Sequence, residues 1–214
     1  MARAKRDIDL FHDVVSKDFP ASLRSLREAI ARPDEQTEAR LQRELARMEA
    51  VVGALEELGR HGEPELRRAR VELFALAAEE VRQLRATPEL ADVRFDIDPG
   101  LHAEGDRRQL AALLRHLLRR AARACRAEAG ALVHFGSGSL NGRAMFFVHD
   151  NGPGMDTARR EKLFRPFERH GELDDTVDIG IVSARRIVER HGGEFVVDSV
   201  PGKGTTIFFS LAGD

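Results

Sequence analysis

The sequence predicts an all-α helical hairpin over residues 1–62, followed by an α+β domain over 63–214 with helices on one face of a mixed sheet. In the first part, apolar residues recur at steps of three or four, which is typical of amphipathic helices. The second part alternates helical stretches with short strand-like runs and glycine-rich turns. A chain of 214 residues can form one large domain or two small ones, so this division suits its length.

The hairpin is predicted from two apolar stripes. One runs over residues 8–30 and the other over 41–58, and Pro33 and Asp34 stand between them as a helix stop and a cap. Two helices of this kind leave apolar surface uncovered after they pair. A second copy of the chain would bury that surface in a four-helix bundle, so we expect a homodimer.

The elements of the second part follow in order. Helices are expected over 71–84, 106–123 and 179–191; strands are expected over 93–97, 131–135, 144–148, 195–198 and 205–211. Turns are expected at 98–100, 136–142 and 201–204, where Gly, Pro, Ser and Asn gather. Helices and strands that alternate in this way pack as layers, which gives the α+β class.

Composition excludes several classes of protein. The chain has 34 Lys+Arg against 36 Asp+Glu, so it lacks the broad basic field of a nucleic-acid-binding protein. Its apolar runs fall far short of the roughly 18 residues of a membrane span, so no membrane partner is expected. A single Cys125 allows neither an internal disulfide nor a thiol-clustered zinc site, and no apolar signal segment follows Met1. We therefore expect a cytoplasmic protein.

The most informative stretch is 146–155. Its strand-like start leads directly to Asp150, and the loop that follows contains Gly152 and Gly154. Glycines let a flat ligand approach the backbone closely, which suits a purine held by the carboxylate. The alternative is that Asp-Asn-Gly-Pro-Gly is only a turn built of strong turn formers.

Further motifs follow in a fixed order. They are Leu-Phe-Arg-Pro-Phe at 163–167, Arg-Ile-Val at 186–188 with His-Gly-Gly at 191–193, and Gly-Lys-Gly-Thr-Thr at 202–206. Together with 146–155 they resemble the Bergerat-type ATP-binding domain of sensor histidine kinases. Residues 8–24 resemble the dimerisation and phosphoacceptor helix of kinases of the bacteriophytochrome and PAS type. The resemblance implies two-component signalling, with a response regulator or another histidine kinase as partner.

The resemblance also implies site residues. The nucleotide-binding set would be Asp150, Gly152, Gly154, Thr206, His116, Arg120 and Gly180. The run 201–205 is no Walker P-loop, because Gly204 separates Lys203 from Thr205 and a strand follows.

The phosphoacceptor position departs from the family pattern. Where the family has a histidine, this chain has Lys17, and a protonated amine offers no lone pair to a phosphate. Asp18 matches the adjacent acidic residue of the family, but without an imidazole beside it we interpret it as an exposed carboxylate. His12 lies five residues earlier, turned about 140° around the helix, and so does not replace the missing acceptor.

The nucleotide site departs as well. The family's magnesium-binding asparagine aligns with Arg120, whose guanidinium cannot bind a cation but could pair with phosphate oxygens. His116, one turn earlier, either faces the site or is a surface residue of an arginine-rich helix. In the glycine-rich run 176–181 only the last glycine, Gly180, remains. Asp178 would repel a phosphate there, and the alternative is that this acidic run is only a surface loop that stays clear of the ligand.

These departures predict a signalling protein that has lost autophosphorylation and acts by binding. ATP or ADP would bind weakly or not at all, magnesium is not expected, and no catalytic residue is expected. The alternatives are an active ATP-dependent histidine kinase with atypical residues and a phosphotransfer protein. No sensor region is recognisable before Asp7, so a stand-alone adaptor and a piece of a longer sensor protein are both open.

Overall fold

The computed structural model describes residues 66–157, 160 and 179–212, together with five isolated helical positions. These five are Arg24, Arg27, Ile30, Ala31 and Thr37. Apart from them, the predicted hairpin over 1–62 lies outside the described residues, as do His12, Lys17, Asp18 and Asp178. The chain divides into two compact units, Met1–Pro64 with Arg165–Ile179 and Glu65–Phe164 with Gly180–Asp214. The fold below belongs to the second unit, and the domain boundary at residue 62 stays a prediction.

The main sheet has five strands in the order β2-β4-β5-β7-β6. Their bounds are β2 Arg94–Ile97, β4 Leu132–Leu140, β5 Arg143–Asp150, β6 Phe195–Val200 and β7 Gly204–Phe209. β2 pairs with β4 in parallel, and all the other pairings are antiparallel, so the sheet is mixed as predicted. A separate antiparallel pair joins β1 (Arg68–Glu72) to β3 (His102–Asp106).

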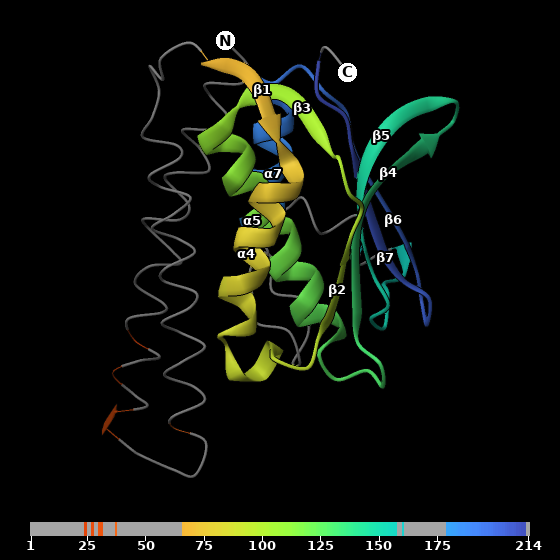
Figure 1. The fold of residues 1–214 in the computed structure, drawn as a ribbon. Coiled ribbons are helices and arrows are strands. Elements are labelled where there is room, and N and C mark those ends of the chain that lie inside the picture. The colour runs from red at the N-terminus through yellow and green to blue at the C-terminus, as the bar shows by residue number, and fades with distance from the viewer. Residues whose placement is uncertain are drawn as a thin grey trace. The chain divides into compact units, whose positions relative to one another are not determined.

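Three helices cover one face of this sheet: α4 (Leu73–Arg85), α5 (Arg107–Cys125) and α7 (Ile179–Arg190) (Figure 1). A short 3-10 helix, η2 (Pro88–Leu90), follows α4. Asp106 caps α5, because its side chain accepts hydrogen bonds from the N–H groups of Arg108 at 3.0 Å and Gln109 at 3.2 Å. The apolar residues of α5 recur at helical spacing and are buried: Leu110, Leu113, Leu114, Leu117, Leu118, Ala121, Ala122 and Cys125.

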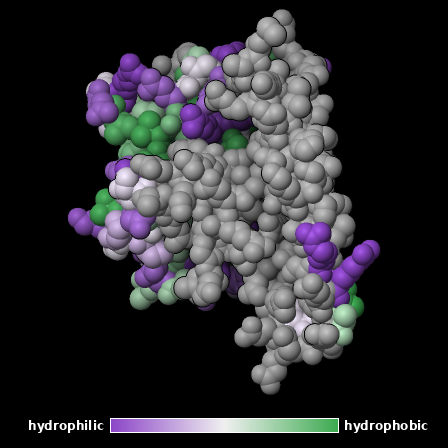
Figure 2. Space-filling model, turned by 180° about the vertical axis from the view of Figure 1, so that it is seen from behind, coloured by the Kyte–Doolittle hydropathy of each residue, from purple (hydrophilic) through white to green (hydrophobic). Residues whose placement is uncertain are grey.

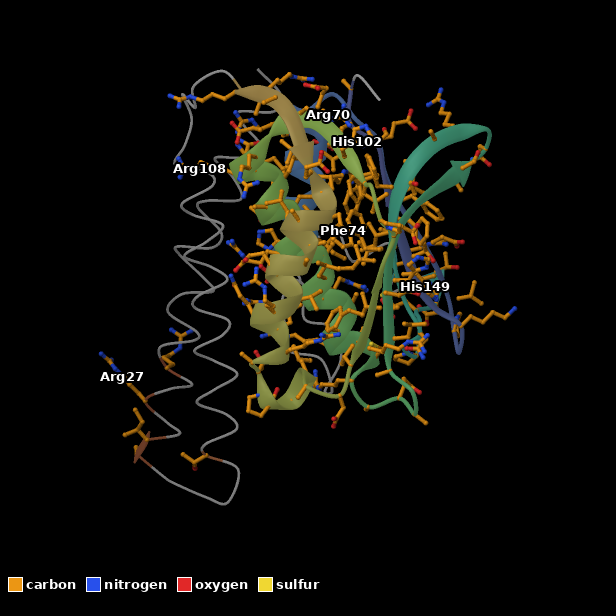
Figure 3. All side chains as sticks on the ribbon, in the orientation of Figure 1. Arg27, Arg70, Phe74, His102, Arg108 and His149 are labelled. Carbon is orange, nitrogen blue, oxygen red and sulfur yellow. The ribbon has the colours of Figure 1, made fainter. Side chains whose placement is uncertain are left out.

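The core lies between the helices and the inner face of the sheet. Phe209 is fully buried there, with its ring centroid 6.5 Å from that of Phe135 and 5.5 Å from that of Phe146. The outer face of the sheet carries His149, labelled in Figure 3, on the side away from the helices. On the sheet side of Figure 2, hydrophobic side chains are interrupted by hydrophilic ones. The layered arrangement confirms the predicted Bergerat-type α+β class.

Two local predictions need correction. Residues 68–72 form strand β1 instead of opening the helix predicted over 71–84, because they pair with β3, which was not predicted. The turn predicted over 136–142 is confined to Asn141 and Gly142, whose positive φ angles of 53° and 79° are typical of a tight hairpin turn. The Gly/Ser-rich run before it is strand, because β5 pairs with β4 along its whole length to Leu140.

None of the helices in the described residues is long and apolar enough to cross a membrane.

Candidate functional site

Asp150 is the buried carboxylate at the end of β5. It is 1% exposed, and its Oδ1 accepts a hydrogen bond of 3.0 Å from the N–H of Gly152. Alternation along β5 turns Asp150 to the inner face with Val148, and the register pairs it with Val133 on β4 and Thr205 on β7. Burial raises the pKa of Asp150, and the nearby Arg120 guanidinium and the Gly152 N–H offset that rise only in part.

Arg120 lies against this carboxylate. Its Nη1 is 3.4 Å from Asp150 Oδ2, its Nη2 is 3.8 Å from Met155 Sδ, and its side chain is 13% exposed. The sequence predicted a site role for Arg120 through phosphate oxygens. The structure gives it an anionic partner within the protein and joins α5 to the end of β5 and to the loop after it, while the phosphate role stays a prediction.

The loop 151–155 is fixed to its neighbours at each step. The side chain of Asn151 accepts from the N–H of Leu132 at 2.8 Å and donates to the carbonyl of Gly130 at 3.1 Å. Met155 N–H donates to Ser199 Oγ at 2.9 Å, which ties the loop to β6. The loop therefore holds a set position beside Asp150.

Gly152 and Gly154 lie so close to neighbouring backbone that a larger residue would not fit at either position. A Cβ at Gly152 would lie 2.8 Å from the carbonyl oxygen of Ala124 on α5. A Cβ at Gly154 would lie 2.1 Å from the carbonyl oxygen of Val200, and the φ of Gly154 is +66°. Neighbouring backbone therefore leaves no room for a side chain at these two positions, and a role of the two glycines toward a ligand stays a prediction.

The two threonines at the start of β7 lie on opposite faces of the sheet. Thr206, named from the sequence, shares the outer face with His149, whose Nδ1 lies 3.0 Å from Thr206 Oγ1. Thr205 faces inward beside Asp150 and is 3% exposed, with its Oγ1 2.9 Å from Ser199 Oγ. The structure therefore brings Thr205, not Thr206, to Asp150. The alternation of Thr205 with the apolar Ile207 and Phe209 was the signal that could have found it.

His116 and Gly180 stand elsewhere along the helices. His116 lies one turn before Arg120 on α5 and is half-buried. Burial, together with the charges of Arg115 and Arg119, lowers the pKa of His116 to about 4, so the imidazole is neutral at pH 7. Gly180 is the second residue of α7 and is also half-buried.

The buried His191, from the His-Gly-Gly motif at 191–193, links the end of α7 to the N-cap residue of α5. The side chain of His191 is 0% exposed, with Nδ1 2.8 Å from the carbonyl of Ile187 and Nε2 accepting from the N–H of Asp106 at 3.1 Å. This pattern needs the neutral tautomer with its proton on Nδ1. Burial lowers the pKa of His191 accordingly.

The donors around Asp150 do not form a metal site. Among the described residues, no group of three His, Cys, Asp or Glu side chains could hold a metal ion. At Arg120, where the family pattern has its magnesium ligand, the guanidinium only donates hydrogen bonds. Arg120 therefore supplies no magnesium ligand at the position where the resemblance places one.

Comparison with known proteins agrees with this fold. Residues 105–213, just over half of the chain, match the family described as histidine kinase-, DNA gyrase B-, and HSP90-like ATPase. The alginate biosynthesis sensor protein KinB of Pseudomonas aeruginosa is 26% identical over 195 residues, covering 87% of this chain and 32% of KinB. The chain spans about a third or less of the length of the curated relatives it matches.

Two solved structures share the fold at low identity. The Acinetobacter baumannii histidine kinase AdeS has a TM-score of 0.63 at 16% identity, covering 95% of this chain and 98% of that one. Histidine kinase ThkA, solved in complex with response regulator protein TrrA, has a TM-score of 0.65 at 18% identity, covering 93% and 62%. Curated relatives that the chain matches are described as sensor proteins. The chain belongs to the histidine kinase-, DNA gyrase B- and HSP90-like ATPase family.

Proposed function

We propose that this chain is a two-component signalling module that has lost autophosphorylation and acts by binding. The observation that carries the proposal is the ion pair between Arg120 and Asp150. It puts a fixed cation at the family's magnesium-ligand position. Transfer of a phosphoryl group depends on metal charge at the phosphates, and a guanidinium held by Asp150 supplies no metal ligand.

Two features of the sequence support the same conclusion. Lys17 stands where the family's phosphoaccepting histidine would be, and a protonated amine is no nucleophile at neutral pH. Asp178 replaces a glycine of the phosphate-binding run, so that run carries a charge of the same sign as phosphate. The acceptor, the metal ligand and the phosphate loop thus depart together, and no single substitution would restore the chemistry.

The nucleotide that this family binds is ATP or ADP, and the base end of the site still has a suitable group. Asp150 is a buried carboxylate, which is an appropriate acceptor for the amino group of adenine. We propose that Asp150 retains this role and that binding is weak. Thr205 shares its face of the sheet and belongs to the same end of the site.

The proposed partners follow from the family resemblance. We propose a homodimer formed by a phosphoacceptor-like hairpin of the bacteriophytochrome and PAS type over residues 1–62, which docks a response regulator or another histidine kinase. ThkA, which shares the fold, is solved in complex with a response regulator. Light scattering on the purified chain should give twice the monomer mass, and a monomer at micromolar concentration would exclude the dimer.

The test of lost autophosphorylation is incubation with ATP labelled at the γ-phosphate, with magnesium, followed by gel separation under alkaline and acidic conditions. We expect no acid-labile label on the protein. A variant carrying Lys17→His, Arg120→Asn and Asp178→Gly is the matched comparison, since it restores the family's residue at all three positions. Acid-labile label on the unmodified chain would refute the proposal and favour an active kinase.

A further inference from the structure

Both oxygens of the Asp150 carboxylate already have partners in the protein. Oδ1 accepts from the N–H of Gly152 at 3.0 Å, and Oδ2 lies 3.4 Å from Nη1 of Arg120. An amino group that approached Oδ2 would have to share it with a guanidinium or displace it. A cation at that oxygen also reduces its strength as an acceptor for a neutral donor.

Arg120 is held at this position by more than one contact. Its other terminal nitrogen, Nη2, donates to Met155 Sδ at 3.8 Å, and its side chain is only 13% exposed. Its neighbours Arg115 and Arg119 on α5 differ, because they pair with Glu80 on α4 and are about half exposed, at 50% and 47%. Arg120 thus lies largely buried beside Asp150, the residue that we propose contacts the base.

The charge balance explains why the pair persists. Asp150 is 1% exposed, and an ionised carboxylate that deep in the protein is costly unless a cation or several donors accompany it. Burial raises its pKa, and Arg120 is the largest influence opposing that rise. The carboxylate therefore holds the arginine, which is always charged, more readily than a neutral adenine amine that must be recruited from solution.

We infer that Arg120 is an internal competitor of the nucleotide base: it occupies the Asp150 carboxylate, and an adenine compound binds only when the Arg120 side chain withdraws. The inference deepens the proposed function and rests on it for the role of Asp150 at the base end of the site. Arg120 thereby sets the affinity for the base itself, independently of phosphate or metal.

Adenosine is the probe that separates this inference from a phosphate role, because it has the base and no phosphate. Calorimetric titration of adenosine and ADP, without magnesium, would compare the unmodified chain with Arg120→Asn. The control is Arg108→Asn, which removes an exposed arginine from the same helix (Figure 3). We expect Arg120→Asn to bind adenosine at least tenfold more tightly than the unmodified chain, and Arg108→Asn to match the unmodified chain. Adding Asp150→Asn to Arg120→Asn should remove the gain.

Several results would overturn the inference. Equal adenosine affinity in the unmodified chain and Arg120→Asn would mean that Arg120 does not compete. Weaker ADP binding in Arg120→Asn, with adenosine unchanged, would mean that Arg120 serves phosphate instead. An absence of adenosine binding in both proteins would mean that Asp150 is no base site. None of these results depends on autophosphorylation, so the labelled-ATP experiment fails or succeeds separately.

The Arg120→Asn variant leaves Asp150 without its cation and could lose its fold, which circular dichroism would detect. In that case Arg120→Lys replaces it, because a lysine keeps the charge beside Asp150 but cannot contact Asp150 and Met155 with two nitrogens. Adenosine should then bind at least threefold more tightly than to the unmodified chain. An unchanged affinity in a folded Arg120→Lys variant would count against the inference.

Discussion

Replacement of His116 by asparagine should make the free energy of unfolding less dependent on pH below pH 6.5. The pKa of His116 is lowered from 6.5 to about 4 by burial and by Arg115 and Arg119, so the folded protein resists protonation there while the unfolded chain does not. Between pH 6.5 and about 4 the unfolded state therefore binds more protons, and stability falls as the pH falls. The stabilisation is present in full above pH 6.5 and is lost toward pH 4.

The size of the effect follows from the same change in pKa. Each pKa unit by which the folded and unfolded states differ corresponds to about 1.4 kcal/mol of unfolding free energy. His116 therefore accounts for about 3 kcal/mol at most between neutral pH and pH 4. Its ring keeps some contact with solvent, which reduces that figure. Other groups also titrate in this range: His191 adds to the loss, whereas Asp150, whose pKa is raised, acts in the opposite direction.

The difference between variant and unmodified protein removes those other contributions. Urea unfolding would be followed by circular dichroism at pH 7.0, 6.0, 5.0 and 4.5, because the chain has no Trp or Tyr for fluorescence. The free energy of unfolding of His116→Asn should fall less steeply with pH than that of the unmodified chain, by up to about 1.4 kcal/mol per pH unit. His102→Asn, at an exposed histidine, is the control for loss of an imidazole. Parallel profiles for His116→Asn and the unmodified chain would refute this account.

Two further predictions concern stability and reactivity. Gly154→Ala should lower the free energy of unfolding by about 2–4 kcal/mol in urea, since its Cβ would lie 2.1 Å from the Val200 carbonyl at a φ of +66°. Gly202→Ala, with a φ of +74° and open space around it, should cost only about 1–2 kcal/mol, and equal losses in the two variants would contradict the contact. Burial raises the pKa of Cys125 to about 11, so iodoacetamide should alkylate the folded chain at least about 100-fold more slowly than the urea-unfolded chain. Comparable rates in the two states would show that Cys125 is accessible.

Much of the second part of the fold could be predicted from local patterns. The helix over 106–123 was predicted because its apolar residues recur at helical spacing, and α5 spans Arg107–Cys125. Strands β1 and β3 could not be predicted in the same way. Their residues, such as Arg68 and His102, are largely polar and exposed, and only their pairing with each other makes them strands. Pairing between residues 30 to 38 positions apart is a tertiary effect that periodicity does not record.

The candidate site was predictable in its residue types and less so in its geometry. A carboxylate after a strand, followed by two glycines, pointed to Asp150, and the structure brings Gly152 to it at 3.0 Å. The choice between Thr205 and Thr206 depended on which face of β7 points inward, and the motif alone did not decide it. The buried Ile207 and Phe209 do decide it, because side chains alternate along a strand.

The pairing of Arg120 with Asp150 shows where reasoning from a motif reaches its limit. The motif assigns Arg120 to the phosphates, because a cation at a metal-ligand position is expected to meet the anion that the metal would meet. In the folded chain a second anion lies within reach, 30 residues away in sequence, and it is present whether or not a ligand is bound. A phosphate that binds from solution loses translational and rotational entropy, whereas the Asp150 carboxylate is already held in place by β5 and by Gly152. Arg120 therefore pairs with the Asp150 carboxylate in preference to a phosphate from solution. It follows that restoring asparagine at residue 120 should free the base end of the site, while kinase chemistry would still lack its acceptor at Lys17.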